Sequence, residues 1–219
     1  SACPAGNRML QLYYPEALQF LAPVDSPMLA HVKMLKAARP QAKVVFIGPC
    51  IAKKREGRES GIVDGVLTFE DLKRFFEEKG VDVKNIARFA ADGGGDVNRA
   101  KYYPISRGII KSFDKYADGY EYVAVDGADK CREVLENIGS LSGMFLELNS
   151  CEYACVNGPC SLIHKGSAVK ANAAIRKYTN KDLENKVSRK IETPDGVSFA
   201  REYKRMRPDD RIPSEREIA

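Results

Sequence analysis

The chain has 219 residues, a net charge of +5 at pH 7 and 44% hydrophobic residues, as in an ordinary globular protein that buries a substantial core. No apolar run approaches the roughly 20 residues that cross a bilayer, and the N-terminal residues lack the basic and apolar regions of a signal peptide. From residue 165 onward, 14 Lys and Arg stand against 9 Asp and Glu. These charges are mixed and no nucleic-acid-reading motif accompanies them, so we expect neither a nucleic-acid nor a membrane partner.

Hydrophobic periodicity and turn residues predict helices that alternate with strands. The predicted helices span residues 7–20 with a break at Pro15, 27–38, 68–79, 106–116 and 128–138. The predicted strands span residues 42–47, 62–67, 120–125 and 144–148. Ser26-Pro27 and the segment from Thr68 to Asp71 are typical of helix N-termini. This alternation predicts an α/β fold with mostly parallel sheets and flanking helices.

We expect the chain to be organised in two parts. Residues 1–165 contain all six cysteines and the alternating strands and helices. Residues 166–219 are predicted to be a C-terminal helical extension and linker, with a turn at Thr193-Pro194-Asp195-Gly196. The segment 86–98 contains three consecutive glycines without the spacing of a phosphate-binding loop, so we predict a connecting loop there.

Three cysteine segments lie far apart in the sequence. They read Ser-Ala-Cys3-Pro-Ala, Gly-Pro-Cys50-Ile-Ala-Lys53-Lys54-Arg-Glu56 and Cys151-Glu-Tyr-Ala-Cys155-Val-Asn157-Gly158-Pro159-Cys160. Two of them follow predicted strands, and ligand sites of α/β proteins form where strands end. We therefore expect thiolates from loops to converge as Cys3, Cys50, Cys151 and Cys155. Four thiolates are the ligand set of a [4Fe-4S] cubane cluster, and a reducing cytoplasm is the simplest setting for free thiols.

A tetrahedral zinc site is the main alternative for four thiolates. Zinc sites usually use closely spaced pairs of cysteines, and in this set only Cys151 and Cys155 form such a pair. Cys131 lies on a predicted helix beside Leu135 and is expected to pack as a small hydrophobic residue. The sequence leaves two roles open for Cys160, which are a spare thiol and an alternative ligand.

Together the three segments resemble the cluster-binding C-terminal domain of the [FeFe]-hydrogenase large subunit over about residues 1–165. The resemblance implies two lobes with the cluster in the cleft between them. It also implies that Cys3, Cys50, Cys151 and Cys155 hold a [4Fe-4S] cluster and that Cys155 bridges to a diiron centre. The family domain normally begins before the first of these motifs, so we expect part of one lobe to be absent from this sequence.

By the same resemblance, Lys53 contacts a cyanide ligand of the diiron centre and Glu56 belongs to a proton route. Other positions depart from the pattern of catalytic relatives. Ala2 stands where those relatives have a proton-relaying cysteine, so efficient turnover by the usual route is not expected. Gly48 and Asn149 replace methionines of the diiron pocket. Residues 152–154, Glu-Tyr-Ala, replace Pro-Gly-Gly.

These departures resemble a divergent, sensory branch of the family. Its members continue past a segment like Pro213-Ser-Glu-Arg-Glu217-Ile218 into a further iron–sulfur module and often a PAS or signalling domain. The resemblance implies reversible oxidation of H2 to protons and electrons, slow or sensory, with ferredoxin-like partners. The alternative hypothesis is a non-catalytic iron–sulfur protein, of electron-transfer or cluster-assembly type, that lacks the diiron centre.

Overall fold

The computed structural model describes residues 1–83, 85, 99–163, 167–185 and 193–207. The helices are α1 (Pro4–Tyr13), α2 (Pro27–Ala38), α3 (Ala52–Ser60), α4 (Phe69–Glu78), α5 (Gly108–Ser112), α6 (Ala128–Glu136) and α7 (Ala168–Asn185). Short 3-10 helices are η1 (Pro15–Phe20), η2 (Arg99–Tyr102), η3 (Ile138–Ser140) and η4 (Cys155–Asn157). The strands are β1 (Val45–Gly48), β2 (Gly65–Thr68), β3 (Glu121–Asp126) and β4 (Met144–Asn149). The loop predicted at 86–98 and the motif at 213–218 lie outside the described residues.

Local sequence signals account for most of these boundaries. The break predicted at Pro15 is present, because α1 ends at Tyr13 and η1 begins at Pro15. The Ser26 hydroxyl accepts a hydrogen bond from the Leu29 amide at 3.5 Å and caps α2. Thr68 and Asp71 form a reciprocal capping box at the start of α4. The capping predictions are therefore confirmed at both helices.

Helix α3 was not among the helices predicted from the sequence, and it carries Lys53 and Glu56. The segment is almost entirely polar, so it carries no hydrophobic periodicity, although Lys, Arg and Glu are good helix formers. Gly61 ends the helix in the left-handed conformation, with φ of 67°. Lys53, Glu56 and Gly57 are the buried residues of α3, so the helix turns a largely charged face inward.

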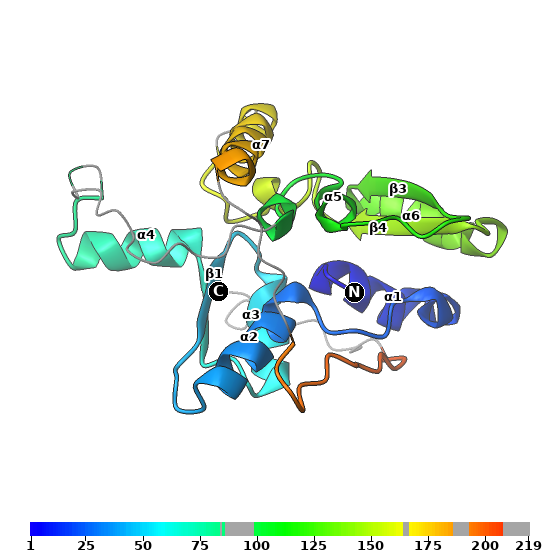
Figure 1. Ribbon diagram of the computed structural model, residues 1–219, viewed down its shortest axis with the longest axis horizontal. Helices are drawn as coiled ribbons and strands as arrows, with labels where there is room; N and C mark the ends of the chain where they lie inside the picture. The colour runs from blue at the N-terminus through cyan, green and yellow to red at the C-terminus, as the bar shows by residue number, and fades with distance from the viewer. Residues whose placement is uncertain (84, 86–98, 164–166, 186–192, 208–219) are drawn as a thin grey trace.

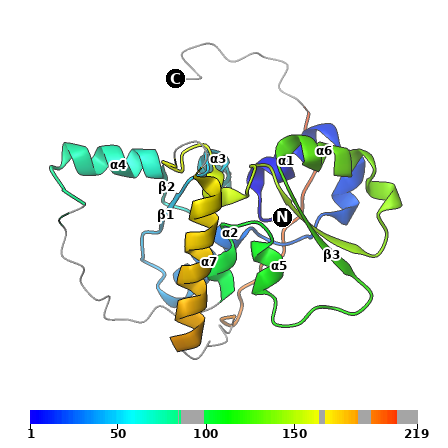
Figure 2. The same cartoon turned by 90° about the horizontal axis from the view of Figure 1, so that it is seen from above.

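The strands form two parallel pairs, and each pair belongs to a βαβ unit. In the first unit β1 pairs with β2 and α3 connects them, and in the second β3 pairs with β4 through α6. Figures 1 and 2 show the two units side by side, with α7 crossing between them and packing against η2 and η4. Strand-helix alternation with parallel pairing confirms the predicted α/β fold.

Helix α1 lies between the two units and contacts both α3 and α6. Leu10 of α1, Ala17 of η1 and Leu135 of α6 form a buried apolar cluster. This packing places the N-terminal segment, with Cys3, against the second unit. None of the helices in the described part of the chain is long and apolar enough to cross a membrane.

The residues after α7 return to the N-terminal half of the molecule. We call residues 193–207 the C-terminal strap, which begins with a turn closed by the hydrogen bond from the Val197 amide to the Pro194 carbonyl. This confirms the turn predicted from Thr193 to Gly196. The strap then forms an isolated antiparallel bridge between Ala200 and Val24. It therefore packs against the residues that lead into α2 (Figure 1).

Candidate functional site

The three cysteine segments meet in the folded chain. The Cys3 thiol lies 3.6 Å from the hydroxyl of Ser150, the residue immediately before Cys151. The Cys160 amide donates to the Pro49 carbonyl at 3.0 Å, and a Cβ added to Gly158 would lie only 2.8 Å from the same oxygen. The N-terminal segment therefore adjoins the segment after β4, which in turn packs closely on the segment after β1.

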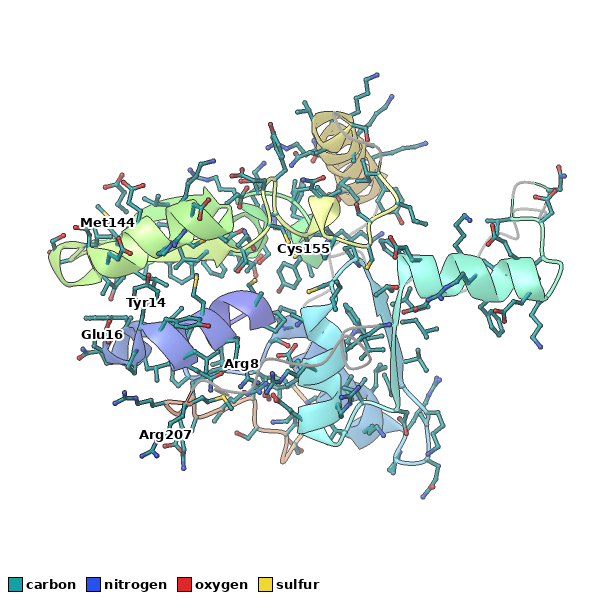
Figure 3. The ribbon with its side chains drawn as sticks, turned by 180° about the vertical axis from the view of Figure 1, so that it is seen from behind. Arg8, Tyr14, Glu16, Met144, Cys155 and Arg207 are labelled. Atoms are coloured by element: carbon teal, nitrogen blue, oxygen red, sulfur yellow. The ribbon has the colours of Figure 1, made fainter. Side chains whose placement is uncertain are left out.

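Each segment holds its cysteine in a different way. Cys3 is the N-cap of α1, and its sulfur accepts a hydrogen bond from the Gly6 amide at 3.4 Å. Cys50 precedes α3, and the backbone amides of Ala52 and Lys53 bond to its sulfur. Cys155 begins η4 near the middle of the molecule, where the two βαβ units meet (Figure 3).

The thiols influence one another electrostatically. Burial, followed by negative charge on Cys3 and Cys50, raises the pKa of Cys151 to about 11. Burial first, and then negative charge on Cys3, Cys50 and Cys151, raises the pKa of Cys155 to about 12. The pKa of Cys50 is raised for the same two reasons, burial first and the nearby Cys3 second. The four thiols predicted as ligands are therefore close enough to repel one another when ionised.

This electrostatic arrangement fits a cationic metal group. Four thiolates gathered in a half-buried site are costly unless positive charge compensates them, and the iron ions of an iron–sulfur cluster supply it. Within the described ranges, no three side chains of His, Cys, Asp or Glu have the spacing that one metal ion needs. The residues that would hold a cluster are Cys3, Cys50, Cys151 and Cys155.

Lys53 is buried beside the thiol site, with only 8% of its surface exposed. Its ammonium nitrogen lies 2.6 Å from a Glu56 oxygen, 3.0 Å from the Ser26 hydroxyl and 3.4 Å from the Ala2 carbonyl. An ammonium has three N–H donors, so these acceptors use all of them. The positive charge of Lys53 also acts to lower the pKa of Cys155, so the ammonium is near enough to that thiol to interact with its charge.

Glu56 is 4% exposed and bridges two cations. Its Oε2 atom pairs with Lys53, and its Oε1 atom lies 3.4 Å from a guanidinium nitrogen of Arg201 in the C-terminal strap. The sequence did not predict a role for Arg201, because its contact with Glu56 joins residues 145 positions apart and no local sequence pattern indicates such a contact.

A second buried polar cluster lies on β4 and was also missed. Glu147 is 3% exposed, accepts from the Ile110 amide at 3.0 Å and receives the Asn149 side-chain amide at 3.2 Å. Asn149 also donates to Asp126 at 3.0 Å. Burial raises the pKa of Glu147. Glu147 is a single carboxylate within an otherwise largely apolar predicted strand, and this pattern could have indicated a buried polar cluster.

The remaining cysteines lie at the edge of the site. Cys131 is 1% exposed, as expected for a packing residue, and its thiol donates to the Asn149 carbonyl at 3.4 Å. Cys160 is buried near Thr68 and Glu70, and burial raises its pKa. The structure thus places Cys160 against the start of α4.

The backbone between Cys151 and Cys155 is strained. Tyr153 has a φ of 62°, and Ala154 has a φ of 63° with a ψ of −160°, a region that essentially only glycine occupies. Ala154 is fully buried. The loop therefore keeps a glycine-type conformation with Tyr and Ala side chains in place.

Two βαβ units with three cysteine segments brought together between them are the arrangement of an α/β protein with a cysteine-rich site. Comparison with known proteins makes this class specific. Residues 1–159 match the family "Iron only hydrogenase large subunit, C-terminal domain". The chain belongs to this family, as its cysteine motifs predict, and is an iron-only hydrogenase-like domain of the H-cluster type.

The relatives found by sequence and by structure agree with this assignment. The chain is 27% identical over 165 residues to the periplasmic [Fe] hydrogenase large subunit of Nitratidesulfovibrio vulgaris. That match covers 64% of this chain but only 39% of the relative. A variant of [FeFe]-hydrogenase HydA1 from Chlamydomonas reinhardtii superposes with a TM-score of 0.67 at 15% identity, covering 94% of this chain and 75% of the other. An [FeFe]-hydrogenase from a study of oxygen inactivation of the H cluster gives 0.66 at 14% identity, covering 94% and 74%. These two structures show the shared fold.

Proposed function

We propose that Cys3, Cys50, Cys151 and Cys155 hold a [4Fe-4S] cluster and that the chain is a redox-active domain of slow or sensory type. The observation that carries the proposal is the convergence of three cysteine segments, in which the Cys3 thiol lies 3.6 Å from the Ser150 hydroxyl and the Cys160 amide donates to the Pro49 carbonyl at 3.0 Å. When bound, such a cluster supplies one-electron transfer. The chain itself orients the sulfur atoms, excludes much of the water around Cys155 and places the Lys53 ammonium nearby.

A diiron subsite with H2 chemistry is the further part of the proposal. Lys53 is the residue that would contact an anionic ligand, since its charge is buried beside the thiols. The weakest of its three contacts, to the Ala2 carbonyl at 3.4 Å, is the one that a ligand would replace. Ala2 offers no titratable side chain, so proton transfer at that position depends on water and turnover is slow.

Glu56 has a different role in this proposal from the proton carrier that the resemblance implies. Lys53 and Arg201 each engage one of its oxygens. This double engagement favours a positioning role, in which the carboxylate holds the Lys53 ammonium at the edge of the thiol site.

A non-catalytic iron–sulfur protein without the diiron centre is the second candidate. The full engagement of the Lys53 donors by Glu56, Ser26 and Ala2 favours it, because the ammonium already has its partners without an external anion. Such a protein would carry the [4Fe-4S] cluster for electron transfer or cluster assembly.

The two candidates separate in one anaerobic experiment. The chain is produced with and without the diiron maturation enzymes, and iron, sulfide and zinc are quantified alongside infrared spectra in the carbonyl and cyanide region. Four irons and four sulfides without infrared bands support the second candidate, and added bands that appear only after maturation support the first. Stoichiometric zinc in place of iron contradicts both.

The infrared bands also test Lys53. Lys53→Met is expected to shift the cyanide bands, whereas Lys54→Met is the matched control because Lys54 is 40% exposed and pairs with Asp71. Unshifted bands in Lys53→Met would contradict a contact with the ligand.

We also propose a cytoplasmic location and ferredoxin-like iron–sulfur modules as partners, with a signalling domain downstream of residue 219. All six cysteines are free thiols in the structure, which suits a reducing compartment. In the proposed organisation, residues 1–165 hold the cluster-binding cysteines, α7 and the C-terminal strap pack against them, and the partner module follows.

A further inference from the structure

The C-terminal strap is bound to the N-terminal half of the molecule by backbone hydrogen bonds. The Asp25 amide donates to the Phe199 carbonyl at 2.8 Å, and the Arg201 amide donates to the Pro23 carbonyl at 3.0 Å. Further along, the Met206 amide donates to the Gln11 carbonyl at 2.9 Å. These bonds fix the backbone on both sides of Arg201, so its side chain is delivered to one place.

That place is the buried carboxylate behind the thiol site. The Arg201 guanidinium lies 3.4 Å from Glu56 Oε1, while Lys53 lies 2.6 Å from Glu56 Oε2. The Arg201 side chain is 26% exposed and the Lys53 side chain 10%, so water screens this group only in part. Glu56 thus connects a cation from the strap to the cation beside the cysteines.

The charges of this group do not cancel. Glu56 neutralises one of its two cations, which leaves one net positive charge in the trio of Lys53, Glu56 and Arg201. The adjacent carboxylate of Asp25 does not offset it, because Lys33 pairs with Asp25 at 2.6 Å. Without Arg201, the Lys53–Glu56 pair would be neutral.

We propose that Arg201 is a positioning residue that holds Glu56 against Lys53 and sets the reduction potential of the iron–sulfur group in the thiol site. Reduction adds negative charge to such a group, and a nearby positive charge in a partly dry environment favours it. Partners of this kind, outside the ligand set, tune metal centres in general. The inference rests on the proposed [4Fe-4S] cluster and adds the strap as the element that adjusts it.

The test compares the midpoint potential of the reconstituted cluster in four forms of the full chain, by redox titration monitored with electron paramagnetic resonance. We expect Arg201→Gln to lower the potential, and Arg201→Lys, which keeps the charge, to restore most of it. Arg205→Gln is the matched control, since Arg205 is exposed on the same strap and should leave the potential unchanged.

Release of the strap must be distinguished from loss of the charge. Hydrogen exchange at the amides of Asp25 and Arg201 reports whether the strap stays bound. A lowered potential with unchanged protection at these amides supports the inference. A lowered potential that always accompanies lost protection, also in Arg201→Lys, would overturn it in favour of a purely structural strap.

The remaining outcomes separate this inference from the function on which it rests. A cluster that loads normally and has the same potential in all four forms would overturn the role of Arg201 alone. A chain that loads no iron–sulfur cluster in any form would overturn the proposed function and this inference with it.

Discussion

Cys50 and Cys155 both come after a strand of a parallel pair, yet the chain around them is built differently. Around Cys50 the structure relies on charge, because α3 turns Lys53 and Glu56 inward and the C-terminal strap adds Arg201. Around Cys155 it relies on backbone shape, with two consecutive residues at positive φ and Gly158 packed on a carbonyl.

The difference shows that a thiol site can be shaped by two independent means. A buried ion pair is sensitive to the loss of one partner, whereas a strained backbone is sensitive to the residue type at the strained position. Loss of a charged partner beside Cys50 should therefore lower the free energy of unfolding, whereas glycine at the strained position beside Cys155 should raise it. Both cysteines should matter equally for iron binding.

The largest expected effect is on iron binding and would show that the two sides act together. Cys50→Ser and Cys155→Ser should each lose most of the bound iron, because a serine hydroxyl does not replace a thiolate ligand. Iron and sulfide analysis after anaerobic reconstitution measures this. Cys160→Ser is the control and should keep its iron, and an equal loss in that variant would show that the ligand set is misassigned.

On the charged side, Glu56→Gln should destabilise the metal-free chain by about 3 kcal/mol, because it leaves a buried ammonium without its counter-ion. Urea unfolding measures this free energy. Glu59→Gln is the matched control on the same helix, since Glu59 is 42% exposed and its pairs with Arg8 and Arg55 should contribute less than about 1 kcal/mol. Equal effects of the two substitutions would contradict the importance of burial.

On the strained side, Ala154→Gly should stabilise the chain by about 1 kcal/mol. Relief of an unfavourable φ/ψ region gains about 1–3 kcal/mol, and the extra freedom of glycine in the unfolded chain takes back roughly 0.5–1 kcal/mol. Thermal and urea unfolding measure the change. Ala173→Gly, in the exposed face of α7, should destabilise instead by about 0.5–1 kcal/mol, and the same sign in both variants would argue against strain at Ala154.

The smallest effect concerns the strap that completes the charged side. Burial raises the pKa of Tyr203 to about 12, while its hydroxyl donates to the Val24 carbonyl at 2.9 Å. The neutral phenol is therefore favoured in the folded chain, so its stabilisation is present below about pH 10 and is lost as the pH rises towards 12. Since solvent reaches part of the ring, we expect at most about 1 kcal/mol. Tyr203→Phe should remove this part of the pH dependence of unfolding, and identical slopes in both forms would contradict it.

Much of the fold follows from the sequence because its signals are local. The side chains of Ser26, Thr68 and Asp71 accept hydrogen bonds from backbone amides three residues away. Pro15 interrupts a helix because its ring removes the backbone N–H and clashes with the preceding turn. The four cysteines could be grouped as a predicted site because the sequence itself shows where strands end and how the cysteine motifs are spaced. The family follows from the same motifs.

Only the tertiary structure decided how those cysteines are surrounded. The charged face of α3 is buried because Arg201 and Ser26, distant in sequence, supply its partners. Tyr153 and Ala154 hold left-handed backbone because the segment is packed between fixed neighbours, against the preference of the residues themselves. Sequence patterns record the preferences of short stretches of chain, whereas the compensation of buried charge and the tolerance of strain depend on contacts between segments that are distant in the sequence, such as the 145 positions between Glu56 and Arg201.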